Sequence, residues 1–542
     1  MSGDHDHAAV PRELPESVDI YDTTLRDGSQ QEGLSLTVDD KLRVAEQLDH
    51  LGVHFIEGGW PGANPKDAEF FARAAAGELR LHHATLVAFG STRKAGGRAE
   101  TDPVLANMLA AQTPAVCLVA KAAEWHVTET LRTSLMEAIE MVSDSIQFLV
   151  GEGRRVFLDA EHFFDGYRAN PQFSLDVLRA AAGAGAEVVV LCDTNGGTLP
   201  FEVERTVGQV RDALDGAIGC HFHNDSGCAV ANSLVAVRQG ATQVQGCING
   251  YGERTGNADL SATVPNLTLK MGIRTIGAEQ LTRLTAAAHH IAELVNVAPA
   301  ADQPFVGTSA FAHKAGLHTS AIVRSPQAYE HVDPDAVGNG SRFVVSEMAG
   351  RATIALKAAE LGLDLDAPAM SDVVEQLKVL EHRGYHFEVA DGSLDLLMRA
   401  AAGWKQEFFR LESHRVICDL REDGTFVTEA TIKVHVGDER VLATAEGNGP
   451  VHALDAALRQ AIGPRYPQLA GIHLTDFKVR VLDSSRGTGS VTRVLIDSTD
   501  GERTWSTIGV SENVIEASWA ALADSIVYGL LHFDADGQNR QP

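Results

Sequence analysis

Eight short apolar runs alternate with longer, helix-like segments between Val18 and about Asn257. Runs such as VDIYDTTL and EVVVLCDTNGG have the length of buried strands, whereas segments such as TVDDKLRVAEQLDHLG carry apolar residues at spacings of three and four. Strands that alternate with helices form parallel sheets, because each helix carries the chain back to the start of the next strand. Eight such repeats favour a closed (β/α)₈ barrel, a TIM barrel, over an open doubly wound sheet.

Polar residues of the types used in catalysis gather at the C-terminal ends of these runs. They are Arg26, Asp27, Glu57, Glu161, Asp193, Thr194, His221, His223, Asn249 and Asn257. In a barrel of this kind the active site lies at that end of the strands. The sequence therefore predicts one site at the barrel mouth.

The segment GCHFHND contains two histidines one residue apart, His221 and His223. Side chains two apart on a strand point the same way, so both imidazoles can reach one metal ion. Asp27, in DTTLRDG, can add a carboxylate from another strand. Two histidines and one carboxylate leave coordination positions open for water or substrate, which is typical of a catalytic metal site. For the HxH motif alone, two structural histidines in a strand remain the alternative.

Composition restricts the partners and the compartment. The net charge of −28 disfavours a nucleic-acid or anionic-membrane partner. No apolar run is long enough to suggest a membrane-spanning helix. The six cysteines show no paired spacing, which is typical of reduced thiols in a cytoplasmic protein.

The pattern along the chain predicts four parts. Residues 1–17 form a disordered tail, residues 18–288 the catalytic barrel, and residues 289–405 a helical linker or accessory subdomain. Residues 406–542 alternate apolar and polar positions between turns and are predicted to form an antiparallel α+β domain. Within this part TAEGNGPVHALDAAL recurs faintly as TIGVSENVIEASWAAL, which suggests two strand-rich units that each end in a helix. Effector binding and dimerisation are both open as its role.

With DTTLRDG, HFHND, GERTGN, AEGNGPVHALDAAL and SENVIEASWAAL in place, the chain resembles the DRE-type TIM-barrel acyltransferases. This is the family of 2-isopropylmalate, homocitrate and citramalate synthases. The resemblance covers nearly the whole chain. It implies condensation of the methyl group of acetyl-CoA with the keto group of a 2-oxo acid, followed by hydrolysis of the thioester. It also implies that the C-terminal domain is regulatory.

The resemblance implies roles for several residues at the metal. Asp27, His221, His223 and Asn257 would hold Mg²⁺ or Mn²⁺, with Zn²⁺ possible because two ligands are imidazoles. Arg26 would face the oxygen on which negative charge develops. Thr194 matches a threonine that binds the substrate carboxylate in the family.

Further residues are assigned to proton transfer and to CoA. Glu161 matches a glutamate near the substrates, while His318 and Tyr329 match residues that the partner subunit contributes in family members, which implies a homodimer. Gly250, Gly252 and Gly256 allow a close approach of backbone amides to CoA at the barrel rim, unless they form a plain turn.

Two segments, EGGWPG and EHFFDG, resemble the citramalate synthase subgroup. Trp60, His162, Phe163 and Phe164 would shrink the pocket, which favours pyruvate as the acceptor and citramalate as the product, on a route to isoleucine. Isoleucine is then the expected feedback effector. The alternatives are 2-isopropylmalate or homocitrate synthesis, a lyase of the hydroxymethylglutaryl-CoA type, and an inactive amino-acid sensor.

Overall fold

The computed structural model describes residues 13–538 except 315, 346–349, 406, 483–486 and 488. The chain divides into two compact units. The first contains the residues up to Phe311 together with His331–Ser341, and the second contains Ala312–Glu330 and the residues from Arg342 onward. The segment 289–405, predicted as one accessory subdomain, is therefore shared between both units.

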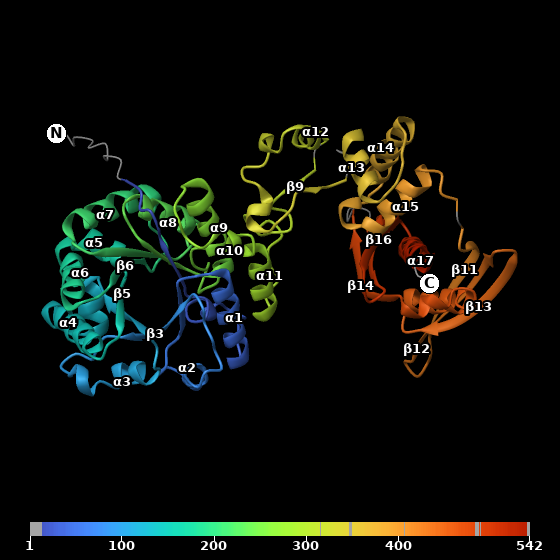
Figure 1. The fold of residues 1–542 in the computed structure, drawn as a ribbon. Helices are drawn as coiled ribbons and strands as arrows, with labels where there is room; N and C mark the ends of the chain where they lie inside the picture. The colour runs from blue at the N-terminus through green and yellow to red at the C-terminus, as the bar shows by residue number, and fades with distance from the viewer. Residues whose placement is uncertain are drawn as a thin grey trace. The chain divides into compact units, whose positions relative to one another are not determined.

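The first unit is a closed barrel of eight parallel strands in sequence order, drawn from blue to green in Figure 1. The strands are β1 (Asp19–Asp22), β2 (Phe55–Gly59), β3 (Thr85–Ser91), β4 (Ala115–Lys121), β5 (Arg155–Glu161), β6 (Val188–Asp193), β7 (Ala217–Phe222) and β8 (Gln243–Gly246). The barrel closes where β1 pairs in parallel with β8. Each predicted run overlaps one of these strands, so the predicted (β/α)₈ barrel is confirmed.

Helices connect the strands and cover the outside of the barrel (Figure 1). They are α1 (Val38–Leu51), α2 (Pro65–Ala75), α3 (Pro103–Ala110), α4 (Leu135–Gly151), α5 (Phe163–Ala169), α6 (Pro171–Ala184), α7 (Pro200–Ala213), α8 (Ala229–Arg238), α9 (Leu260–Pro265), α10 (Ala278–Leu281) and α11 (Leu284–Leu294). Helix α1 shows why such segments are helical. Thr37 and Asp40 form a capping box at its start, and Gly52 ends it with a φ of 84°.

Aromatic side chains fill the barrel interior between β1, β2 and β5. The ring centroids of Tyr21 and Phe55 lie 5.8 Å apart, and those of Phe55 and Phe157 lie 4.9 Å apart. All three side chains are buried. The interior is thus a packed core, and it gives the polar groups at the strand ends a rigid floor.

The second unit contains two antiparallel sheets of three strands. Their strands are β11 (Arg410–Leu420), β12 (Phe426–Val436), β13 (Glu439–Gly447), β14 (His473–Val481), β15 (Thr492–Thr499) and β16 (Thr504–Ser511). Helix α16 (Pro450–Ile462) follows the first sheet and α17 (Val514–Gln538) follows the second. The repeated order of three strands and a helix matches the faint internal duplication in the sequence.

The remaining elements of this unit precede the sheets. They are α12 (Gly316–Arg324), α13 (Arg351–Glu360), α14 (Ala367–His382), α15 (Asp391–Ala401) and the two-residue strands β9 (Ala312–His313) and β10 (Arg342–Phe343). Ile354, Leu377 and Leu394 from α13, α14 and α15 share a buried cluster with Ile508 of β16. These helices therefore belong to the core of the second unit.

One segment, Val514–Phe533 within α17, is long and apolar enough to cross a membrane by length and composition. Its residues Ala517, Leu522, Ile526 and Leu530 are buried in the core of the C-terminal sheets. The apolar face of α17 is thus used for packing within the domain.

Candidate active site

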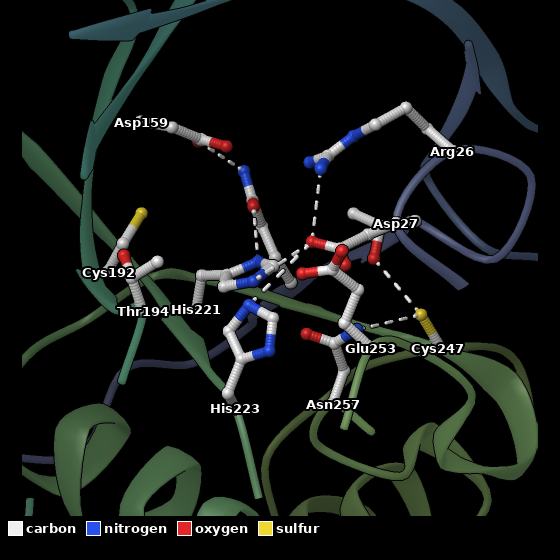
Figure 2. A network of polar contacts seen from close by, with 12 residues as sticks. Arg26, Asp27, Asp159, Cys192, Thr194, His221, His223, Cys247, Glu253 and Asn257 are labelled. Atoms are coloured by element: carbon white, nitrogen blue, oxygen red, sulfur yellow. Dashed lines mark hydrogen bonds and ion pairs between the residues drawn. The ribbon is translucent and has the colours of Figure 1, made fainter. Parts of the chain in front are cut away.

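Asp27, His221 and His223 meet at the C-terminal end of the barrel. His221 lies near the end of β7 and His223 directly follows it, while Asp27 lies in the loop after β1. His221 Nε2 is 3.5 Å and His223 Nε2 is 3.9 Å from Asp27 Oδ2. Figure 2 shows both imidazoles directed toward this carboxylate. Strand alternation thus gives the arrangement that the HxH spacing predicts.

Electrostatics hold this group in the ionisation state that metal binding needs. Burial alone would raise the pKa of Asp27, but Arg26 and the two imidazoles lower it to about 2. Burial lowers the pKa of His221 to about 4 and also lowers that of His223. At neutral pH the group therefore offers one carboxylate and two neutral imidazoles.

Asn257 lies beside His223, with which it forms an isolated antiparallel bridge. Its Nδ2 donates to the carbonyl oxygen of Tyr251 at 3.0 Å. Gly252 and Gly256 have φ values of 144° and 85°, and a Cβ at Gly252 would clash with Asn257 Nδ2. These glycines, with Gly250, therefore let the loop fold tightly around Asn257.

The donor set fits a divalent metal ion. One ligand atom each from Asp27, His221 and His223 lies within 4.8 Å of the others. Among the residues that the structure describes, the buried atoms Asp27 Oδ1, His223 Nδ1 and Asn257 Oδ1 have no hydrogen-bond partner. The free lone pairs of Asp27 Oδ1 and Asn257 Oδ1 in this buried site, together with the two imidazoles, suit a metal with open coordination positions.

Arg26 is fixed beside this group by three contacts. Its guanidinium donates to Glu57 Oε1 at 2.5 Å and to Asp27 Oδ2 at 3.0 Å. The guanidinium carbon also lies 4.0 Å from the centroid of the Phe89 ring. Tyr21 in turn donates to Glu57 Oε2 at 2.7 Å. The cation is thus held at one orientation in a site shielded from water.

A cavity of about 670 Å³ opens above the metal ligands. Trp60, Phe89, Glu161, Thr194 and Arg254 are among the residues that line it. A volume of this size is normal for a small-molecule site. Asp27, His221 and His223, predicted for the metal, therefore share one cavity with Thr194, predicted for the substrate carboxylate, and with Trp60, predicted for the pocket wall.

Two of these lining residues have strong local contacts. Thr194 Oγ1 accepts from the backbone N–H of His162 at 2.9 Å, and its carbonyl oxygen accepts from Arg254 at 2.7 Å. Glu161 is paired with Lys121, its direct neighbour on β4, which also lines the cavity. Lys121 was not singled out from the sequence, since nothing local marks it as the partner of Glu161.

Phe163 and Phe164 do not line the cavity, so the predicted shrinking of the pocket by EHFFDG is wrong for them. His162 has a φ of 56°, which turns the chain from β5 into α5. Phe164 then packs against Phe222, whose side chain alternates with His221 and His223 and points out of the barrel. Trp60 lines the cavity as predicted, 5.5 Å from the Phe89 ring, whereas His162 is not among the lining residues, so the prediction is wrong for it as well.

His318 and Tyr329 lie in the second unit, within and after α12. Their rings stack at 4.1 Å. The metal group and its cavity are built by the first unit alone. The proton-relay role of this pair stays a prediction.

Two further buried residues escaped the sequence analysis. Gln245 on β8 contacts His221, and Asp159 on β5 contacts Gln245 and lines the cavity. Asp159 and Gln245 are 86 residues apart, so no local motif signals their contact.

Comparisons with known proteins agree with this geometry. The HMGL-like family model matches residues 17–291, a model described as homocitrate synthase post-HMGL domain-like matches 305–384, and the LeuA allosteric (dimerisation) domain model matches 388–530. An (R)-citramalate synthase from Streptomyces coelicolor is 53% identical, covering 96% of this chain and 98% of its own. The (R)-citramalate synthase of Aquifex aeolicus is 47% identical, covering 97% and 100%. That of Synechocystis sp. is 51% identical, covering 94% and 96%.

The chain therefore belongs to the HMGL-like family. Within that family it is an acyltransferase of the citramalate synthase group, to which it is similar over nearly its full length.

Proposed function

We propose that the chain condenses acetyl-CoA with pyruvate and hydrolyses the thioester, giving citramalate and free CoA. A carbon–carbon bond forms between the acetyl methyl carbon and the keto carbon of pyruvate, and water replaces CoA on the acyl carbon. The observation that carries the proposal is the buried group of Asp27, His221 and His223 beneath the cavity, with Arg26 fixed beside it. The similarity to (R)-citramalate synthases supports the choice of substrates.

The residues of the cavity suit the steps of this reaction. A divalent ion held by Asp27, His221 and His223, Mg²⁺ or Mn²⁺ by preference, would supply a Lewis acid for the keto oxygen. Arg26 places a fixed positive charge where the alkoxide develops. Thr194 directly follows β6 and lines the cavity, where its hydroxyl could orient the carboxylate of pyruvate.

The acetyl methyl group needs a positioned base, because its protons are far less acidic than any side chain. Glu161 faces the same cavity and is held by Lys121. We assign to Glu161 the contact with the reacting methyl or with the water that hydrolyses the thioester. His318 and Tyr329 would complete a proton relay from a partner subunit in a homodimer. The glycines around Asn257 would lie at the CoA side of the mouth.

The C-terminal domain supports regulation by a small molecule, since it matches the LeuA allosteric (dimerisation) domain model. We propose isoleucine as the feedback effector, on a pyruvate route to that amino acid. The cytoplasmic placement stays a prediction of the sequence.

The test measures CoA thiol release from acetyl-CoA with Mg²⁺ or Mn²⁺. Pyruvate, 2-oxobutyrate, 2-oxoisovalerate and 2-oxoglutarate are compared, each with and without isoleucine or leucine. We expect the highest kcat/KM with pyruvate, and inhibition by isoleucine. A preference for 2-oxoisovalerate would overturn the choice of substrate but leave the reaction class in place. A rate of CoA release that is the same with and without each 2-oxo acid would overturn the substrate and the reaction class together.

A further inference from the structure

A buried chain of hydrogen bonds runs from His221 into the floor of the barrel. His221 Nδ1 lies 3.0 Å from Gln245 Oε1, and Gln245 Nε2 donates to Asp159 Oδ1 at 2.9 Å. All three side chains are buried. His221 and Gln245 are direct neighbours on β7 and β8, whereas Asp159 reaches Gln245 from β5. The contact therefore crosses the barrel interior.

Asp159 decides which way the amide of Gln245 points. Asp159 Oδ1 accepts from Gln245 Nε2, and one carboxyl oxygen stays an acceptor even when Asp159 binds a proton, so the NH₂ group of Gln245 faces Asp159 and its carbonyl oxygen faces His221. That oxygen can only accept, which places the imidazole proton of His221 on Nδ1. The lone pair is then on Nε2, the atom that lies 3.5 Å from Asp27 Oδ2.

The second histidine of the group is different. His223 Nδ1 is buried and has no hydrogen-bond partner among the residues that the structure describes. The Nδ1 side of the His223 ring thus lacks the directed hydrogen bond that holds the His221 ring. Of the two imidazoles, His221 is the one whose tautomer the protein sets in advance.

We propose that Gln245, itself oriented by Asp159, is a positioning residue that presets the tautomer and the ring orientation of His221 for metal binding. The inference rests on the proposed metal site. A metal-binding histidine ordinarily donates its other N–H to an acceptor, and loss of that acceptor weakens metal binding about 10- to 100-fold.

The chain offers a matched control two residues away on the same strand. Gln243 is fully buried, and among the described residues its amide atoms have no hydrogen-bond partner. Gln243→Leu therefore removes the same chemical group from the same barrel strand without removing a contact to a metal ligand.

Mn²⁺ is titrated into the full-length metal-free protein, and free Mn²⁺ is followed by electron paramagnetic resonance. We expect Gln245→Leu to raise the Kd for Mn²⁺ about 10- to 100-fold, and Asp159→Asn to raise it less. Gln245→Glu retains an acceptor for the Nδ1 proton, so we expect a Kd closer to that of the wild type than to that of Gln245→Leu. Gln243→Leu should bind Mn²⁺ as the wild type does.

His221→Ala separates failure of this inference from failure of the metal site. If Gln245→Leu binds Mn²⁺ like the wild type while His221→Ala does not, the positioning role is wrong and the metal site stands. If His221→Ala also binds like the wild type, the metal assignment is wrong, and the positioning role with it. Equal weakening in Gln243→Leu and Gln245→Leu would show a general effect on the barrel and overturn the inference. Should Gln245→Leu not fold, a loss of affinity in Gln245→Glu equal to that of His221→Ala would also contradict it.

Discussion

Two groups of three potential metal ligands lie in the same barrel. One contains Asp27, His221 and His223, and the other contains Glu57, Cys117 and Asp159. Both groups are buried, and in each the ligand atoms lie within 4.8 Å of one another. By spacing and residue type alone, either group satisfies the requirements of a metal site.

Their ionisation differs. In the first group the carboxylate is ionised and the imidazoles are neutral. In the second, burial and then Glu57 raise the pKa of Asp159 to about 7, and burial raises the pKa of Glu57 and that of the Cys117 thiol. The second group thus retains protons that a metal would have to displace.

Their hydrogen bonds differ as well. Glu57 already accepts from Tyr21 and Arg26, and Asp159 accepts from Gln245. The first group keeps buried lone pairs that no described residue satisfies. Ionisation and free lone pairs, rather than distance, therefore distinguish a metal site from a structural polar cluster.

The largest expected effect is the loss of metal binding and activity when a ligand of the first group is removed. We expect His221→Ala to abolish Mn²⁺ binding at micromolar concentration and to reduce kcat/KM by at least about 10³-fold, because Lewis-acid stabilisation is worth several kcal/mol. Cys117→Ser changes the second group and should leave Mn²⁺ binding at one ion per chain. Equilibrium dialysis with metal analysis measures both variants. Metal lost in Cys117→Ser and kept in His221→Ala would reverse the assignment.

Arg26 contacts Glu57 of the second group and Asp27 of the first. Substitution of Arg26 shows whether its charge serves the reaction or metal binding. We expect Arg26→Met to lower kcat about 10²- to 10³-fold, as loss of one donor to a developing oxyanion does. The Kd for Mn²⁺ should change much less, since Arg26 is not a ligand. Arg26→Lys retains the charge and should recover part of the rate. Steady-state kinetics and Mn²⁺ titration measure these quantities. A rise in the Kd for Mn²⁺ by the same factor as the fall in kcat in Arg26→Met would contradict this role.

Trp60 lines the cavity above the first group, so its substitution tests whether it limits the size of the 2-oxo acid that the cavity accepts. Trp60→Ala should raise kcat/KM for 2-oxoisovalerate relative to pyruvate by about tenfold, because added space in an apolar pocket is worth about 1–3 kcal/mol. Phe163→Leu is the control, since Phe163 is buried outside the cavity. An equal change of preference in both variants would show that the pocket wall lies elsewhere.

The protonated second group predicts an effect of pH on stability. The pKa of Asp159 is about 7 in the folded chain, because of burial and then Glu57, and about 4 in an unfolded one. The unfolded state therefore releases this proton between about pH 4 and 7 while the folded state keeps it. The stabilisation is complete below about pH 4 and is lost as the pH rises to 7. The thermal midpoint of the wild type should thus fall relative to that of Asp159→Asn over this window, and parallel midpoints would contradict the protonation.

Much of the barrel and of the metal group could be predicted because the signals are local. A strand alternates its side chains, so the HxH spacing of His221 and His223 already gives two ligands on one side. The wrong reading of Phe163 and Phe164 has a backbone cause, the positive φ of His162, which no residue-type pattern shows.

The contacts that orient the ligands could not be predicted for a different reason. Gln245 meets His221 across 24 residues and Asp159 across 86. These contacts arise when the barrel closes, and the sequence carries no periodicity that records them.

The most direct test measures CoA thiol release from acetyl-CoA and pyruvate by the wild type, before and after complete removal of metal with a chelator. We expect the rate to disappear with the metal and to return when Mg²⁺ or Mn²⁺ is added in excess of the chelator. An unchanged rate in the metal-free protein would contradict the assignment of Asp27, His221 and His223 as the catalytic metal site.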